Sequence, residues 1–285
     1  MSLVVNTNVA SLNAQRSLSS SGAELKTAME RLSSGKKINS AADDAAGFAI
    51  AERMTAQIRG LNMATKNAND GLSMLAVIEN ATNDVTDMLQ RMRELAIQAA
   101  NDTNGSADRG FLQSEVSQLI QEIDRVATQT QYNGETILNG NFTDKKIQVG
   151  TESGQTVNFS VDSIGIADLG RNVTTDGVET FSAIQDIKVG TAAEASEALA
   201  TITGAIEQVA SDRASHGALQ NRLEYTASNL MNVAEFTTSA RSRIEDADFA
   251  AESARLAKAQ VLQQTGTAML AQANASPKLA LSLIK

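Results

Sequence analysis

The side chains that could perform acid–base or nucleophilic chemistry in this chain are few and scattered. His216 is the single histidine among 285 residues, and cysteine is absent. Zinc thiolate sites, disulfides and thiol nucleophiles are therefore excluded, and a Ser–His–Asp triad could use only His216. Asp212 lies one helical turn earlier, but Ser215-His216-Gly217 is more simply interpreted as a helix irregularity. No G-x-S-x-G, Walker A or G-x-G-x-x-G run occurs.

Two adjacent carboxylates, Asp43 and Asp44, are the next candidates for acid–base chemistry. Neighbouring residues on a helix point in different directions, so these two do not form a catalytic pair. Ser40 stands three residues before Asp43, which is the spacing of a capping box. The sequence therefore predicts that a helix starts at Ser40. It predicts no catalytic residue, no cofactor or metal site, and a protein that is not an enzyme.

The stretch from Leu89 to Gln98 has the composition of an interface. Helical spacing places Arg91, Glu94 and Gln98 near one side, and apolar residues such as Leu95 near another. An apolar anchor beside a charged rim is common at protein interfaces. An ordinary core stripe with a solvated outer face explains the same pattern, and the residues alone leave both interpretations open.

The composition favours helices that must pack side by side. Hydrophobic residues make up 42% of the chain but aromatic residues only 3%, and Pro277 is the single proline. Long uninterrupted helices are thus allowed almost everywhere. A net charge of −9 argues against nucleic-acid binding. The first residues lack the pattern of a cleaved signal peptide, and no run approaches the ~18–20 apolar residues that would insert into a membrane.

Apolar periodicity divides the chain into two helical parts around a different middle. From about residue 70 to 100, apolar residues recur at steps of three and four, from Leu75 to Ala99, as a heptad-like seam. A polar turn at 102–106 and a second amphipathic helix follow, so these two helices should lie antiparallel. Between 132 and 190, alternation at period two predicts a β-hairpin around Ile147 and Val157 in a small, exposed region. Helix returns from about 191.

These patterns predict a mainly α fold, with long antiparallel helices, a coiled coil from both termini and a small β-hairpin and loop insert. The expected parts are an inner coiled-coil segment at 1–40, the two halves of a helical domain at 41–140 and 191–245, an outer β/loop part at 141–190, and a second inner segment at 246–285. The terminal segments carry thin apolar stripes that offset little of their ordering entropy. We expect them to fold only when many copies pack together.

Several ordered motifs resemble those of bacterial flagellins. At the N-terminal side they are Asn6–Gln15, Arg31–Gly47 and Ile123–Gly134, and at the C-terminal side Leu219–Leu223 and Ala240–Phe249. The resemblance covers about the first 140 and the last 95 residues. It implies the subunit of an extracellular flagellar filament used for swimming, with the termini in an inner layer and the insert facing outward.

The resemblance also implies partners. They are further copies of the chain, possibly mixed with a second flagellin, an export chaperone at the C-terminal segment, and the filament cap and hook–filament junction proteins. Some flagellins are detected by an innate immune receptor through a face that matches this sequence. The candidate subunit-packing and receptor-recognition residues are Gln90, Arg91, Glu94, Leu95, Gln98 and Glu115.

Three other classes remain open from the sequence. A hook–filament junction protein would share the helical pattern, and so would a secreted coiled-coil effector whose ends fold or bind alone. An enzyme within the insert is the third, although the insert shows no catalytic grouping.

Overall fold

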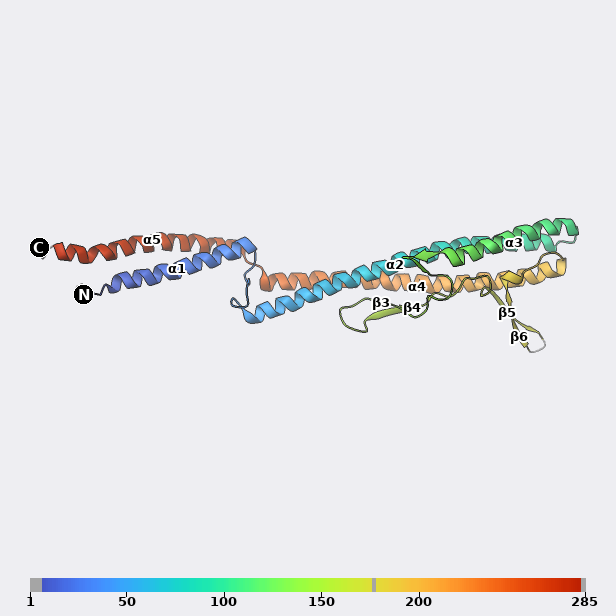
Figure 1. Ribbon diagram of the computed structural model, residues 1–285, viewed down its shortest axis with the longest axis horizontal. Helices are drawn as coiled ribbons and strands as arrows, with labels where there is room; N and C mark the ends of the chain where they lie inside the picture. Colours follow the sequence, from blue (N-terminus) through green and yellow to red (C-terminus); the bar gives the residue numbers. More distant parts are fainter. Residues whose placement is uncertain (1–6, 176–177, 283–285) are drawn as a thin grey trace. The chain divides into compact units, whose positions relative to one another are not determined.

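The computed structural model describes residues 7–175 and 178–282, and within them five α-helices dominate (Figure 1). The predicted fold class is confirmed: long helices come from both ends of the sequence, and short strand pairs lie in the middle. The helices are α1 Val9–Ser34, α2 Ala45–Ala100, α3 Ser106–Gln129, α4 Ala192–Glu245 and α5 Phe249–Ser282.

Contacts divide the chain into two units. The terminal unit comprises residues 1–58 and 235–285, and the central unit comprises residues 59–234. Helices α2 and α4 each contribute residues to both units. The division of the chain into inner and outer filament parts stays a prediction.

The central unit is held by the predicted apolar seam of α2. Its residues from Leu75 to Ala99 are buried, with Leu89 rather than Met88 filling the middle of the seam. Helix α3 runs antiparallel to α2, since Arg109 donates from Nε to the Ala99 carbonyl at 2.8 Å while Arg91 reaches Glu115 further along. Helix α4 closes this core with a line of small and branched residues: Ala195, Ala198, Ile202, Ala205, Val209 and Leu223.

In its described residues, the segment between α3 and α4 forms three antiparallel strand pairs and one short 3-10 helix. They are β1 Gln131–Tyr132 with β2 Glu135–Thr136, β3 Lys145–Gln148 with β4 Thr156–Phe159, and β5 Gly170–Thr175 with β6 Val178–Ala183, followed by η1 Ile184–Asp186. The predicted hairpin is confirmed, with Ile147 opposite Val157. Asn133 and Gly134 adopt the positive φ values that a two-residue hairpin turn requires.

The sequence predicted that this segment is exposed, but the structure buries part of it. Many of its apolar side chains belong to the same buried core as the helices: Ile137, Leu138, Val157, Phe159, Val161, Ile164, Leu169, Ile184, Ile187 and Val189. The expectation of exposure was wrong because the apolar residues of this mainly polar segment stand one at a time and form no clear periodic pattern. Each of them turns toward the helices while its neighbours stay in water.

Helices α1 and α5 pack on each other in the terminal unit (Figure 1). Their inward positions are small or polar, including Ser11, Ser21, Ala28 and Ala259. Small residues at these positions let two helix backbones approach closely. Residues 1–6 and 283–285 lie outside the described residues, and with them Val5 of the predicted stripe and the last residues of the predicted chaperone-binding segment.

Two local predictions need correction. The Ser40–Asp43 spacing makes a turn, not a helix start, because the Asp43 amide closes a single turn onto the Ser40 carbonyl at 3.1 Å and the helix begins only after it. Helix α2 begins at Ala45, where Asp44 caps it by accepting from the Gly47 amide at 3.0 Å. The predicted irregularity at His216 is absent as well: α4 continues through it.

Candidate assembly and recognition surfaces

Polar contacts join α1 and α5 near the start of α1. Asn8 donates from Nδ2 to the Ala273 carbonyl at 2.7 Å, and Ser11 donates from Oγ to Asn274 Oδ1 at 2.8 Å. A Cβ added at Gly266 would lie 3.3 Å from Leu18 Cδ1, so this glycine marks a close approach of the helices. These contacts set the register of the pair but bury little apolar surface.

The large apolar side chains of the pair point away from this seam. On α1, Val9 and Leu12 are 60% and 55% exposed, and Met29 is also exposed. On α5, Val261 and Met269 are likewise exposed. An apolar stripe that stays in water within one chain marks a surface that gains free energy when another molecule covers it.

One buried carboxylate ties α1 to α5 near the other end of the pair. Glu252 on α5 accepts from Arg31 Nη1 at 3.2 Å and from Arg255 Nη1 at 2.9 Å. Its side chain is almost fully buried, and charge-assisted bonds to two guanidinium groups compensate for that burial. The bond from Arg31 fixes one position of α5 against α1.

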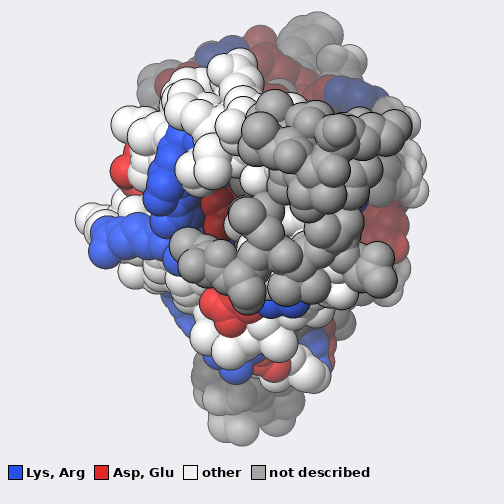
Figure 2. All heavy atoms as spheres, turned by 90° about the vertical axis from the view of Figure 1, so that its left-hand side faces the viewer, with Lys and Arg blue, Asp and Glu red and all other residues white. Residues whose placement is uncertain are grey.

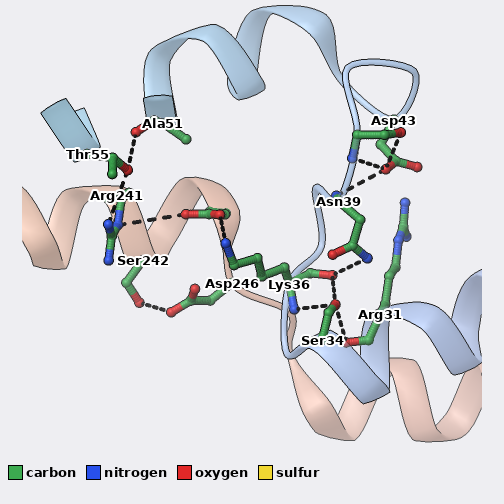
Figure 3. A network of polar contacts seen from close by, with 12 residues as sticks. Arg31, Ser34, Lys36, Asn39, Asp43, Ala51, Thr55, Arg241, Ser242 and Asp246 are labelled. Carbon is green, nitrogen blue, oxygen red and sulfur yellow. Dashed lines mark hydrogen bonds and ion pairs between the residues drawn. The ribbon is translucent and has the colours of Figure 1, made fainter. Parts of the chain in front are cut away.

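A network of polar contacts joins the link between α1 and α2 to the link between α4 and α5 (Figure 3). The Lys37 amide donates to the Glu245 carbonyl at 2.7 Å, and the Ala247 amide donates to the Gly35 carbonyl at 2.9 Å. The Lys36 ammonium pairs with the Glu245 carboxylate. Backbone bonds of this kind form a short two-stranded bridge that aligns the two links.

Further side chains brace the same links. Arg241 donates from Nη1 to Thr55 Oγ1 at 3.2 Å, and Ser242 donates from Oγ to Asp246 at 2.6 Å (Figure 3). Hydrogen bonds from the Ser40 and Asn39 amides lower the pKa of Asp43, so its carboxylate stays ionised and holds the turn before α2. We call residues 34–43 with 241–247 the linker joint. Sequence reasoning missed it as a site, although Lys36 and Lys37 against Glu245 and Asp246 are complementary charges.

The charge of the two units differs. The terminal unit contains 12 Lys and Arg against 10 Asp and Glu, whereas the central unit contains 12 against 23. Figure 2 shows basic and acidic side chains interspersed with uncharged ones on the face turned to the viewer. A nearly neutral unit can pack many copies closely with less self-repulsion than a strongly acidic unit.

Three of the predicted recognition residues, Arg91, Glu94 and Glu115, are brought together by α2 and α3. Arg91 donates from Nε to Glu115 Oε1 at 2.9 Å and from Nη1 to Glu94 Oε2 at 3.0 Å. The bonds to Glu115 and then to Glu94 raise the pKa of Arg91. Gln90 and Gln98 are exposed on the same helix. The recognition cluster, defined here as Gln90, Arg91, Glu94, Gln98 and Glu115, is thus a solvated polar surface.

Leu95 does not belong to this surface. Its side chain is only 1% exposed and lies in the central core beneath the charged side chains. The prediction of Leu95 as an apolar anchor for a partner is therefore contradicted. The i, i+4 spacing from Arg91 placed both residues on adjacent parts of the helix, but the core of the central unit already uses the apolar one.

The remaining titratable candidates, Asp212 and His216, lie partly or fully buried on α4. The Asp212 Oδ2 atom is buried and has no described hydrogen-bond partner. Burial, and then the charge of Asp162, raise its pKa to about 6. Burial likewise lowers the pKa of His216. Among the described residues, no three acidic or histidine side chains come together as a metal site, and no helix has the length and apolarity needed to cross a membrane.

Comparison with known families gives matches at both ends of the chain. The model of the bacterial flagellin N-terminal helical region matches residues 5–143, and that of the C-terminal helical region matches residues 199–284. Flagellin B of Vibrio cholerae is 37% identical, with all of both chains covered. The flagellin of Halalkalibacterium halodurans is 38% identical over 99% of this chain and all of its own.

Two solved structures align with this chain. A putative flagellar hook-associated protein from Vibrio parahaemolyticus aligns with a TM-score of 0.52 at 17% identity, over 72% of this chain and all of the other. Bacillus cereus flagellin aligns with a TM-score of 0.48 at 30% identity, over 58% of this chain and 88% of the other.

Proposed function

Because the chain belongs to the bacterial flagellin family and is a structural filament subunit rather than an enzyme, we propose that its filament is the extracellular propeller of a swimming bacterium. The chain is exported through the flagellar channel and assembles from identical copies, alone or mixed with a second flagellin. Its ends contact the filament cap and the hook–filament junction proteins, and an export chaperone binds the C-terminal segment.

The observation that carries this proposal is that α1 and α5 place small and polar residues against each other and leave their large apolar residues exposed. Within one chain, small and polar residues face the partner helix while Val9, Leu12, Val261 and Met269 face water. Covering apolar surface contributes roughly 25 cal/mol per Å². Neighbouring copies that bury these stripes supply the free energy that the pair lacks alone. The terminal unit is therefore proposed as the main polymerisation element.

Truncation tests this role of the terminal helices. Chains that lack residues 1–35, or all residues after 250, are expected to stay soluble and helical but to form no filaments after seeding. Circular dichroism measures their helicity, and electron microscopy detects filaments. Long filaments from either truncated chain would contradict the proposal. Swimming of a flagellin-deletion strain that expresses the full chain, compared with the truncated ones, tests the motility role.

We also propose that the recognition cluster is read by an innate immune receptor when the subunit is free. Arg91 and Glu115 offer a preorganised pair of opposite charges on two rigid helices, which is suited to a polar partner surface. The same cluster is proposed to contact a neighbouring subunit in the filament. Since Leu95 is buried, the polar side chains must carry both contacts.

Single substitutions separate this recognition from folding. Arg91→Ala is expected to weaken both receptor activation and subunit packing about tenfold, which corresponds to about 1.4 kcal/mol. Arg93→Ala is the matched control, because Arg93 is exposed on the same helix and has no described ion pair. Receptor activation and polymerisation by Arg91→Ala monomers that equal those of Arg93→Ala would refute the proposed role of the cluster.

A further inference from the structure

An open groove lies on the central unit between α2 and the strands that follow α3. Its volume is about 430 Å³, and its apolar lining includes Met74, Phe142, Ile147 and Phe159. Tyr132 also lines it, so three of the nine aromatic residues of this aromatic-poor chain gather here. Concave surfaces with such linings bind apolar side chains or ligands.

Two lysines line this groove, together with one acidic residue, Asp70. The Lys145 ammonium lies 4.5 Å above the Phe142 ring and bonds Glu135 at 3.1 Å. The neighbouring Lys146 is exposed, and the described residues give it no ion pair. An occupant that combines an apolar tip with a nearby carboxylate would therefore match the apolar lining and the ammonium of Lys146.

The chain itself carries such a tip at the start of α3. Phe111 is 76% exposed, and it is flanked on the same helix face by Asp108 one turn before and Glu115 one turn after. Phe249 also has acidic residues one turn on either side, Asp246 and Glu252, but Glu252 is buried and already paired with two arginines. Tyr225 has Arg222 one turn before it, and the residues one turn from Phe236 are uncharged.

Phe111 cannot enter the groove of its own chain. Helix α3 separates them, since the 18 residues from Phe111 to Gln129 rise roughly 27 Å before the chain reaches the groove at Tyr132. An aromatic tip at one end of α3 and a groove near the other end are thus complementary surfaces on one molecule that only two copies can join.

We propose that the groove of one subunit binds Phe111 of a second copy of this chain, with Lys146 facing that copy's Asp108. The two surfaces differ, so each contact leaves one tip and one groove unused and the assembly stays open. This contact extends the proposed filament function, on which it rests, by naming a longitudinal contact between central units.

Site-specific cross-linking tests the contact, because the chain has no natural cysteine. A Ser114→Cys chain and a Lys146→Cys chain are copolymerised and treated with a short bismaleimide. A cross-linked dimer is expected from the mixture but not from either variant alone. Tyr225→Cys replaces Ser114→Cys as the control. No dimer from filaments of the mixture, or an equal yield with Tyr225→Cys, would overturn the proposal.

Substitution of the tip gives a second, independent measurement. Phe111→Ala should raise the subunit concentration needed for polymerisation at least about tenfold, as expected for an aromatic anchor. Thermal unfolding of the monomer should be unchanged, because the side chain is exposed. Tyr225→Ala is the matched control. Equal polymerisation of both variants would refute the contact, whereas failure of the unmodified chain to polymerise would refute the filament proposal itself.

Discussion

The two units of this chain distribute apolar residues in opposite ways. In the central unit the largest fully buried side chains, such as Leu75, Leu95 and Ile202, form a continuous core. None of the largest fully buried side chains described lies in the terminal unit, whose buried apolar residues are Ala28, Ile38, Ala51 and Ala259. The central unit is therefore a self-sufficient domain, whereas the terminal unit resembles half of an interface.

The difference teaches how one chain can be both soluble and polymerising. Ordering a residue costs about 1 to 2 kcal/mol, which a large buried side chain offsets and a buried alanine does not. The central unit meets this cost internally. In the terminal unit, the cost of ordering is offset by the contacts of Glu252 and of the linker joint and, in the proposed filament, by contacts with neighbouring subunits. Four predictions test this contrast.

The largest effect is expected from removing the segment that completes the central core. Replacement of residues 145–185 by a short Gly/Ser linker should unfold the central unit, because Val161, Ile164 and Leu169 would be lost from it. Shortening only the β5–β6 end, residues 172–181, should leave folding and assembly intact. Circular dichroism and thermal unfolding compare the two, and equal stability of both deletions would contradict this account.

Replacing one leucine in each unit by alanine should show the same contrast in stability. Leu95→Ala in the central core should lower the free energy of unfolding by about 2 to 5 kcal/mol. Leu12→Ala removes a side chain that is mostly in water, so the change in the monomer should stay within about 0.5 kcal/mol, while polymerisation weakens. Denaturant unfolding and sedimentation measure the two effects. A large loss of monomer stability in Leu12→Ala would show that α1 is already buried in the free chain.

Substitution of two glycines in the α1/α5 pair should have smaller effects on stability. Gly266→Leu places a bulky side chain against Leu18, and overpacking should weaken the α1/α5 pair by about 1 to 3 kcal/mol. Gly22→Ala meets no atom within 4 Å and should instead stabilise α1 by about 1 kcal/mol. Helicity of the monomer and the polymerisation rate are the measurements. A loss of helicity in Gly22→Ala would indicate an undescribed contact there.

The smallest effect concerns pH and the central unit alone. The pKa of Asp212 is about 6 in the folded chain against an ordinary value of 3.8. The folded chain thus binds this proton more tightly than the unfolded chain does. The contribution of Asp212 to the free energy of unfolding therefore falls as pH rises from about 4 to 6. Asp212→Asn removes the ionised, partly buried carboxylate and should raise the unfolding free energy at pH 7 by about 1 kcal/mol, after discounting for solvent screening.

His216 opposes this trend and supplies the control. Its pKa is lowered by burial, so the unfolded chain takes up a proton first and stability from this group falls as pH drops below about 6.5. Unfolding curves of Asp212→Asn and His216→Asn at pH 4 to 8 should therefore diverge. Parallel pH profiles of the two variants would show that neither group is buried in solution.

The sequence by itself determined the helices, the antiparallel hairpin of α2 and α3, and the strand pair of Ile147 and Val157. Each rests on a local period, either three to four residues for a helix or two for a strand, and needs no knowledge of distant residues. It also indicated the family through long motifs at both ends, and the matches to flagellin family models confirm it. The acidic middle and the near-neutral ends could likewise be predicted from residue types alone.

Only the tertiary structure decided which apolar residues are available. The period that places Leu95 beside Arg91 does not say that the core of the central unit has already buried Leu95, nor that Phe111 and Leu12 remain in water. Burial depends on which distant segment covers a helix face, as Val157, Leu169 and Ile184 do in the core that α2 and α4 share. For the same reason the linker joint emerged only in space: Lys37 and Glu245 are separated by about two hundred residues, and no local pattern pairs them.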